Sequence, residues 1–577
     1  MTTLLHPADT LTRDALTVLQ PGFTGTSAPD WLLRRLGEGL ASVGLFGRNV
    51  ASPEQLAALT AQLRAERDDI LVAIDEEGGD VTRLEVRGGS SFPGNLALGA
   101  VDDTRLTHDV ARELGRRLAE CGVNLNWAPS ADVNSNPSNP VIGVRSFGAD
   151  PRLVARHTAA YVEGLQSAGV AACAKHFPGH GDTAVDSHHD VPHIAAELRT
   201  LQERELVPFR AAIAAGTKAV MSAHILLPAL DTTLPATLSR NVLTGLLRAP
   251  ASEGGLGFDG LIVTDGMEMQ AISATYGIER GSVLAIAAGA DAICVGGGLA
   301  DETTVLRLRD ALVRAVRDGE LSEKRLADAA ARVRALARWT RSAGATQGAL
   351  PGERGVAPAP EAGLVAARRA LRITRNGPYE PLTAPAYVAA FTPVANIAVG
   401  DETPWGVAAE LSRLVPGTET GTYGSGGGAA GGGAGGGGGG GGGAAGDGGG
   451  AAGDGGAAGS PGASERPGGV GSSGTVGSGG AAGRPGASGR GGASGLSAQV
   501  AEVLRAAGER RIVAVVRDVH RHAWMAAALD ALLDARPDTV VVEMGLPQAP
   551  PRGALHIATH GAARVCGRAA AEVIAGV

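Results

Sequence analysis

KAVMSAH (residues 218–224) and GLIVTDG (residues 260–266) each join a short apolar run to a polar residue near its end. Short apolar runs recur along the first half of the chain, with amphipathic stretches such as 151–167 between them. The other runs are VGLFG (43–47), ILVAID (70–75), VNLNWAP (123–129), ACAKHF (172–177) and AICVGG (292–297), with a less clear first one near VLQPGFTG (18–25). Near-continuous apolar strands that alternate with helices indicate a parallel sheet, and this many repeats over roughly 330 residues predict a (β/α)₈ barrel.

A second, smaller α/β domain is predicted beyond residue 363. Its strand-like runs are AYVAAF (386–391), RIVAVVR (511–517), TVVVEMG (539–545) and LHIATHG (555–561), with a helix predicted over 522–533. The Gly-, Ala- and Ser-rich segment 424–496 lacks the apolar groups that offset backbone entropy, so we expect a disordered insertion. The predicted organisation is a catalytic barrel over 10–345, a linker over 346–362 and a C-terminal α/β domain over 363–577.

Composition excludes several classes of protein. A chain of 577 residues with 44% hydrophobic residues can form more than one core, and a formal net charge of −8 disfavours a nucleic-acid or membrane-surface binder. The 4 cysteines are widely spaced, which argues against a disulfide framework or a zinc site. The N-terminus lacks a signal-peptide pattern and no run reaches membrane-spanning length, so we expect a cytoplasmic protein without a membrane span.

Five polar residues each stand where a predicted strand ends: Asp75, Lys175, His176, His224 and Asp265. In a barrel, all carboxyl ends of the strands meet at one face. Any one of these residues could cap a strand or a loop, but five together favour a functional site.

The stretch KHFPGHGDTAVDSHHDVPH (175–193) has three interpretations: a metal cluster, a solvated loop, or acid and base machinery. The spacing of His176 and His180 fits neither the HxH nor the HExxH pattern, so we expect no metal and no cofactor. Asp186 and His188 lie two residues apart and would share one side of an extended segment. Asp186 could then fix the tautomer of His188, whose other nitrogen would exchange a proton near neutral pH.

Four motifs together resemble glycoside hydrolase family 3, in particular its β-N-acetylglucosaminidase (NagZ-type) branch. They are IDEEGGDVTRL (74–84), NPVIGVRSFG (139–148), KHFPGHGDTAVDSH (175–188) and GFDGLIVTDGMEM (257–269), and the resemblance covers about residues 16–341. The long KHFPGHGDTAVDSH string is highly specific, whereas the second domain is similar to that of two-domain members only more weakly.

The resemblance implies a role for each matching residue. Asp265 would be the nucleophile, and His188 with Asp186 would be the general acid/base. The residues that would grip the sugar are Asp75, Arg83, Arg145, Lys175 and His176. Without the resemblance, Asp265 could equally be the N-cap of a following helix. Gly266 departs from the family, because many members have a second aspartate there.

The implied activity is that of a retaining exo-β-N-acetylglucosaminidase that acts through a covalent glycosyl-enzyme. Its partner would be a small carbohydrate, either a cell-wall fragment, as in peptidoglycan turnover, or a chitooligosaccharide. Two alternatives stay open: a phosphorylase that uses inorganic phosphate as acceptor, and a non-catalytic sugar-binding protein.

Overall fold

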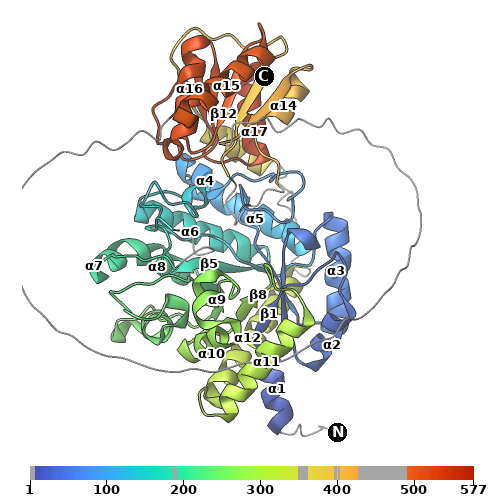
Figure 1. Cartoon of the computed structure of the whole chain (residues 1–577). Helices are drawn as coiled ribbons and strands as arrows, with labels where there is room; N and C mark the ends of the chain where they lie inside the picture. The colour runs from blue at the N-terminus through green and yellow to red at the C-terminus, as the bar shows by residue number, and fades with distance from the viewer. Residues whose placement is uncertain (1–6, 186–190, 348–360, 395–398, 400–402, 426–489) are drawn as a thin grey trace, which may run out of the picture.

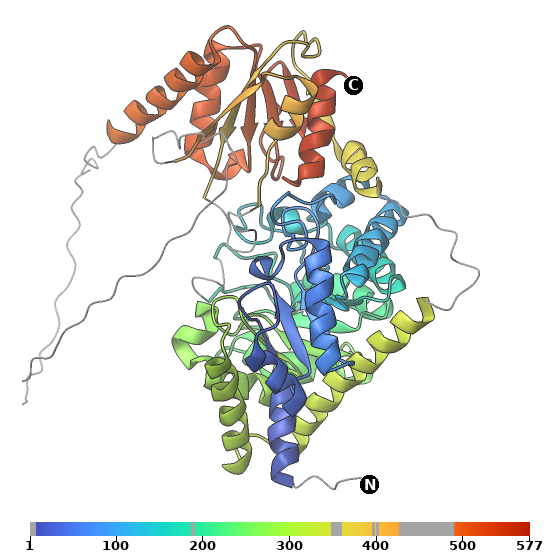
Figure 2. The same cartoon turned by 90° about the vertical axis from the view of Figure 1, so that its right-hand side faces the viewer.

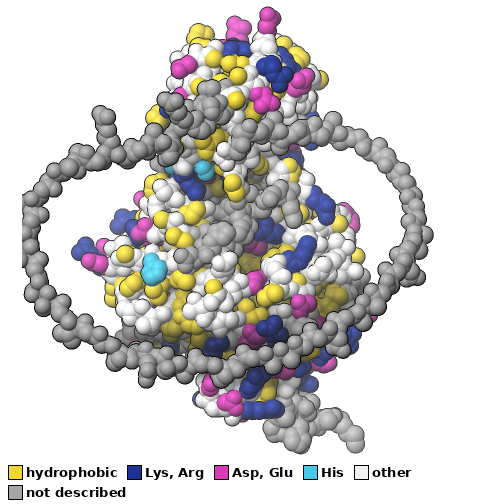
Figure 3. Space-filling model, in the orientation of Figure 1, with side chains coloured by type: hydrophobic (Ala, Val, Ile, Leu, Met, Phe, Trp, Pro, Cys, Tyr) yellow, Lys and Arg dark blue, Asp and Glu magenta, His cyan; other side chains and the backbone are white. Residues whose placement is uncertain are grey.

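The computed structural model describes residues 7–185, 191–347, 361–394, 399, 403–425 and 490–577. Two α/β domains lie one above the other, with the C-terminal domain resting over the α4 and α5 side of the larger N-terminal domain (Figures 1 and 2). On the face drawn in Figure 3, cationic and anionic side chains are interspersed. No helix among the described residues has the length and apolar character needed to cross a membrane.

Eight parallel strands form the larger domain, which confirms the predicted barrel. The strands are β1 (Leu19–Pro21), β2 (Ser42–Leu45), β3 (Leu71–Ile74), β4 (Leu125–Asn126), β5 (Ala171–Phe177), β6 (Ala219–Ser222), β7 (Leu261–Thr264) and β8 (Ile293–Val295). Strands β2 to β7 form one ladder in chain order, and β1 pairs with β8. A bridge between Val263 and Ala292 joins β7 to β8, while the Ser42 hydroxyl donates to the Leu19 carbonyl between β1 and β2 at 3.0 Å.

Helices surround this barrel. They are α1 (Pro7–Thr17), α2 (Asp30–Glu38), α3 (Pro53–Glu66), α4 (Asn95–Val101), α5 (Thr104–Glu120), α6 (Pro151–Ser167), α7 (Leu198–Thr200), α8 (Leu206–Ala214), α9 (Gln270–Tyr276), α10 (Ile278–Ala288), α11 (Glu302–Arg317) and α12 (Glu323–Gln347). Several begin at a side chain that accepts from the first free amides, namely Ser52, Asp103, Asp150 and Asp301. Such caps satisfy backbone donors that the helix itself leaves unpaired.

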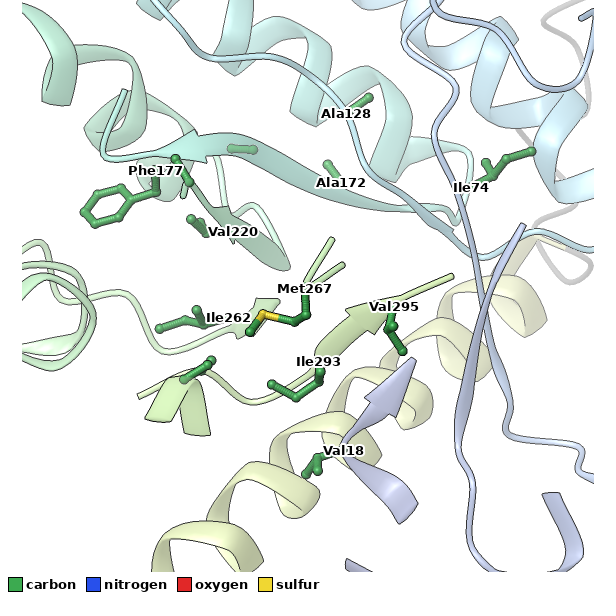
Figure 4. Packing of buried hydrophobic residues seen from close by; sticks show 14 of the residues in the cluster. Val18, Ile74, Ala128, Ala172, Phe177, Val220, Ile262, Met267, Ile293 and Val295 are labelled. Carbon is green, nitrogen blue, oxygen red and sulfur yellow. The ribbon is translucent and has the colours of Figure 1, made fainter. Parts of the chain in front are cut away.

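Side chains along each barrel strand alternate between two cores. On β5, Ala172 and Ala174 belong to the cluster between strands and helices, whereas Ala171 and Cys173 belong to the cluster that fills the lumen. Figure 4 shows part of the outer cluster, including Ala172 and Val220. Because both faces of each strand are buried, the strands read as unbroken apolar runs in the sequence.

The C-terminal domain has one six-stranded sheet in the order β11-β10-β12-β13-β14-β9, in which only the β14–β9 pairing is antiparallel. Its elements are α13 (Ala362–Ala370), β9 (Arg372–Arg375), β10 (Tyr387–Phe391), α14 (Ala408–Leu414), β11 (Glu419–Tyr423), α15 (Arg490–Ala507), β12 (Ile512–Val516), α16 (Ala523–Ala535), β13 (Val540–Glu543), β14 (Leu555–Ala558) and α17 (Arg564–Ala575). The four predicted runs correspond to β10, β12, β13 and β14.

The predicted disordered insertion over 424–496 falls mostly outside the described residues, which omit 426–489. Residues 490–496, which the prediction included in the insertion, form the first turns of α15. The predicted linker over 346–362 also falls largely outside the described residues, which omit 348–360.

Candidate active site

Strand alternation brings three of the predicted residues to the lumen. Leu71 and Ala73 of β3 face the lumen, so Asp75, two residues further, continues on that side. The same parity applies to Lys175, which follows Ala171 and Cys173 on β5, and to Asp265, which follows Leu261 and Val263 on β7. All three stand at the carboxyl end of the barrel, where the loops of such a fold form its active sites.

A cavity of about 940 Å³ opens at this end of the barrel. Its walls include all six predicted site residues that lie among the described residues: Asp75, Arg83, Arg145, Lys175, His176 and Asp265. Trp127, Met221 and Cys294 also line the cavity, and all three belong to the apolar cluster that fills the lumen. The cavity therefore has an apolar base and charged walls, a combination suited to a small polar ligand.

Glu77 lies at the centre of the charged network. Its carboxylate accepts from Arg145 Nη2 at 2.6 Å and from Arg145 Nε at 3.1 Å, and Lys175 Nζ lies 2.7 Å away. Burial alone would raise the pKa of Glu77, but the charges of Arg145 and Lys175 hold it below its usual range. Burial alone would lower the pKa of Lys175, but the charges of Asp75 and Glu77 raise it, so Glu77, Arg145 and Lys175 stay ionised and fixed.

Asp75 connects this network to the cavity. It pairs with Lys175 and accepts from Arg83 Nη2 at 3.4 Å, and its side chain keeps 19% exposure. A carboxylate flanked by two cationic donors can accept hydrogen bonds from adjacent hydroxyl groups while the cations donate to their oxygens. This arrangement is suited to a polyhydroxylated ligand.

A buried aspartate orients His176. Asp132 Oδ2 lies 2.7 Å from His176 Nδ1, and Asp132 Oδ1 accepts from the backbone amides of His176 at 3.2 Å and His180 at 2.7 Å. Burial opposes ionisation of Asp132, but the nearby His176 and these hydrogen bonds lower its pKa. His176 Nε2, 3.4 Å from Arg145 Nη2, is thereby held at the cavity wall.

Asp265 directly follows β7 at the cavity wall. Its backbone amide donates to the Ser222 carbonyl at 3.2 Å, and its Oδ1 accepts from the Gly266 amide at 2.8 Å. The helix that follows, α9, begins at Gln270 with Met269 as its N-cap residue, so the N-cap alternative for Asp265 is wrong.

His224, the fifth strand-end residue, is completely buried. Its Nδ1 lies 2.9 Å from Thr237 Oγ1, and its Nε2 lies 3.0 Å from the Gly266 carbonyl. It thus supports the segment that follows Asp265, and it is not among the residues that line the cavity.

The predicted acid/base pair, Asp186 and His188, lies outside the described residues, which omit 186–190. The neighbouring His189 and Asp190 are omitted as well. In the part of the chain that the structure does describe, no three His, Cys, Asp or Glu side chains are grouped to hold a metal ion.

Three residues of the site escaped the sequence prediction. Glu77 and Asp132 are buried partners of predicted residues, and Glu268 lines the cavity and accepts from the amides of Gly296, at 3.0 Å, and Gly297. Glu77 could have been suspected from its place in IDEEGG, two residues after Asp75. The run in which Asp132 lies, SADV, carries no comparable signal.

Carboxylates and fixed cations around a cavity at the carboxyl end of a parallel barrel define an enzyme site for a small polyhydroxylated molecule. The family model described as "Glycosyl hydrolase family 3 N terminal domain" matches residues 33–336. The chain belongs to glycoside hydrolase family 3, and it is a hydrolase.

Relatives in this family bear hexosaminidase names. A β-hexosaminidase of Thiobacillus denitrificans is 38% identical over 288 residues, which cover 48% of this chain and 78% of the relative. β-Hexosaminidase A of Pseudoalteromonas piscicida is 34% identical over 317 residues, about half of each chain (51% and 52%). The solved structure of a family 3 β-N-acetylglucosaminidase from Paenibacillus sp. str. FPU-7 superposes with a TM-score of 0.76 at 32% identity, covering 98% of this chain and 96% of that one.

Proposed function

We propose that this chain is a retaining exo-β-N-acetylglucosaminidase that removes terminal, non-reducing N-acetylglucosamine from cell-wall fragments or chitooligosaccharides. The observation that carries the proposal is the position of Asp265 in one cavity with the fixed Asp75, Arg83, Arg145, Lys175 and His176 set. The hexosaminidase names of the relatives support the choice of sugar.

In the first step, a carboxylate oxygen of Asp265 attacks the anomeric carbon, and the bond from that carbon to the leaving oxygen breaks. His188 gives its proton to the leaving oxygen, and Asp186 stabilises the imidazole in the required tautomer. The product of this step is a covalent glycosyl-enzyme and a free aglycone. This attack inverts the configuration at the anomeric carbon, and the attack in the second step inverts it again, so the β configuration is retained overall.

In the second step, the neutral His188 takes a proton from water as the water oxygen attacks the anomeric carbon. The bond to Asp265 then breaks and N-acetylglucosamine with the β configuration is released. Arg145 and Lys175 hold the sugar in one position through both steps, because their contacts with Glu77 leave their side chains little freedom to rotate.

A direct test uses an aryl β-N-acetylglucosaminide and the matching aryl β-glucosaminide, each with and without inorganic phosphate. We expect release of N-acetylglucosamine only from the first, independent of phosphate. A sugar phosphate product would indicate phosphorolysis instead, and binding without turnover would indicate a sugar-binding protein. Parallel digestion of a muropeptide fragment and of chitobiose identifies the preferred aglycone.

A further inference from the structure

The loop that follows β3 carries Asp75, Glu77 and Arg83, and it folds back as a tight turn between them. The Glu77 amide donates to the Val81 carbonyl at 3.1 Å, and an antiparallel bridge joins Gly78 to Val81. Gly78 and Gly79 have φ angles of +76° and +66°, which residues with a β-carbon adopt only with strain. We refer to residues 77–81 as the grip turn, because Glu77 holds Arg145 and Lys175.

Asp80, within the grip turn, bonds to the C-terminal domain. Its side chain is 2% exposed and forms an ion pair with Arg517, and its Oδ1 accepts from the Ala562 amide at 2.7 Å. Arg517 follows β12 and Ala562 precedes α17, so both donors come from loops at the carboxyl edge of the second sheet. A buried carboxylate of the substrate-binding loop is therefore satisfied by residues more than 430 positions away in the chain.

The C-terminal domain supports the grip turn at a second place. The Gly79 amide donates to the Phe92 carbonyl at 2.9 Å. The segment just before Phe92 is held by Arg564, whose Nη2 donates to Ser91 Oγ at 2.7 Å, and by the Val565 amide, which donates to the Ser90 carbonyl at 3.2 Å. Both the grip turn and the segment 90–92, to which it is bonded, are thus attached to the same domain.

Arg517 is itself held in place. Its guanidinium lies over the Trp405 ring, 5.8 Å from the centroid, and its side chain is 15% exposed. A planar guanidinium stacked on an aromatic ring presents its donors in one direction. Because both charges are largely buried, removing one partner would leave the other without compensation.

We propose that the Asp80–Arg517 pair makes the C-terminal domain a positioning element for sugar binding in the barrel. Asp80 and Arg517 act through Glu77 and its cationic partners rather than by touching the reacting atoms. This inference rests on the proposed function for its kinetic readout. It predicts that loss of the pair weakens substrate binding and leaves the nucleophile, which lies on a different loop, unaffected.

The test compares Arg517→Ala and Asp80→Asn in the full chain. Asp80→Asn keeps an acceptor for the Ala562 amide and removes only the charge. For both, we expect KM for an aryl β-N-acetylglucosaminide to rise roughly 10-fold or more while kcat changes little, since a misplaced contact of about 1 Å can cost up to 10²-fold. Hydrogen exchange of the peptide that contains residues 76–84 should accelerate in parallel.

The matched control is Arg369→Ala. Arg369 also joins the two domains, through Asp103 at 2.8 Å, but this pair is more exposed and lies outside the cavity wall. The control should leave both KM and exchange of residues 76–84 unchanged. Asp80→Asn/Arg517→Ala should cost no more than either single change, and it provides a readout if Arg517→Ala does not fold, because no unpaired charge remains.

The outcomes separate the two proposals. If the wild-type chain does not cleave the aryl substrate, the proposed function is wrong, and exchange of residues 76–84 still decides the role of the pair. If the wild type cleaves the substrate and folded Arg517→Ala shows unchanged KM and unchanged exchange, the positioning role is wrong.

Discussion

Glu77 in the barrel and Glu543 in the C-terminal domain are both buried carboxylates at the carboxyl edge of a parallel sheet, yet their surroundings differ. Glu77 faces the side chains of Arg145 and Lys175, which hold its pKa below the usual range. Glu543 accepts from backbone amides of Asp518 at 2.9 Å and Gly545 at 2.8 Å, and burial raises its pKa to about 7.

The difference shows that position at a strand end does not by itself indicate function. Cations keep Glu77 charged, and these cations also line the cavity, so their charges remain available to a ligand. The amide donors around Glu543 belong to the loops that follow β12 and β13, so this carboxyl group serves the local fold. A buried acid becomes part of a binding site when its partners are side chains that also reach the ligand.

The largest effect should come from Asp265→Ala. If the carboxyl end of the barrel carries the chemistry, loss of the nucleophile should lower kcat by on the order of 10⁴-fold or more, while N-acetylglucosamine should still bind. The control is Asp259→Ala, because Asp259 lies on the same segment with a side chain that is 92% exposed. A fluorinated N-acetylglucosaminide should add its mass to the wild-type peptide that contains Asp265, and labelling elsewhere would contradict the assignment.

His188→Ala should have an effect that depends on the leaving group. Natural disaccharides should lose on the order of 10²- to 10⁴-fold, whereas dinitrophenyl substrates, whose leaving group needs no proton, should still form the glycosyl-enzyme. Azide should restore turnover and yield a β-glycosyl azide as the product, because an anionic nucleophile needs no general base. His189→Ala is the control and should behave nearly as wild type; equal losses for good and poor leaving groups would leave His188 only a structural role.

Glu77→Gln tests the barrel side of the comparison. Removing the charge leaves the buried Arg145 without its carboxylate partner and Lys175 paired with Asp75 alone, so we expect a loss of about 3–5 kcal/mol in the free energy of unfolding and a higher KM. Because the folded pKa of Glu77 is lowered, its stabilisation is present above its unfolded pKa and is lost as pH falls. Denaturation from pH 7 downward should therefore show a steeper loss of stability for the wild type than for the variant.

Glu543→Gln tests the other side, with the opposite sign. The folded pKa of Glu543 is raised to about 7, so its stabilising contribution is present below its unfolded pKa and lost as pH rises through about 7. Gln cannot ionise, so the variant should lose up to about 3 kcal/mol less than the wild type between pH 4.5 and 8. Parallel curves for the two proteins would mean that Glu543 does not titrate in this range.

The sequence predicted the barrel well because its strands are buried on both faces. The same reasoning missed β9 and β11, whose side chains are mostly exposed at the two edges of the second sheet. RITR and ETGTY carry no apolar run, and their strand conformation depends on pairing with β14 and β10. Edge strands are thus determined by their neighbours rather than by their own hydrophobicity.

For the site, the sequence identified residues that reach the cavity but not the residues that hold them. Asp75, Lys175 and Asp265 were predicted because each ends an apolar run. Glu77 and Asp132 were missed because their partners, Arg145 and His176, lie 68 and 44 positions away, and only the fold brings them together. The roles of Asp186 and His188 stay predictions.

The smallest effect on activity is expected from removing residues 426–489. The chain leaves β11 at Gly424, whose carbonyl accepts from Gln499 Nε2 of α15 at 2.6 Å. Since α15 begins at Arg490, nine residues before Gln499, its start lies about 14 Å along the helix from that bond. A linker of about eight residues, which can span roughly 26 Å, would therefore join the ends without strain.

This deletion should leave kcat/KM within about two-fold of the wild type, because the composition of 426–489 predicts a chain that adds no packing to the barrel. It should also stabilise the C-terminal domain. Shortening a flexible connection from about 64 to about 8 residues is three halvings, each worth about 0.6 kcal/mol of closure entropy, so the free energy of unfolding should rise by about 2 kcal/mol. Removing only half of the segment should add about 0.6 kcal/mol. If neither deletion changes stability, the segment does not behave as a flexible connection, and if a folded deletion variant loses most of its turnover, the segment contributes to the site directly.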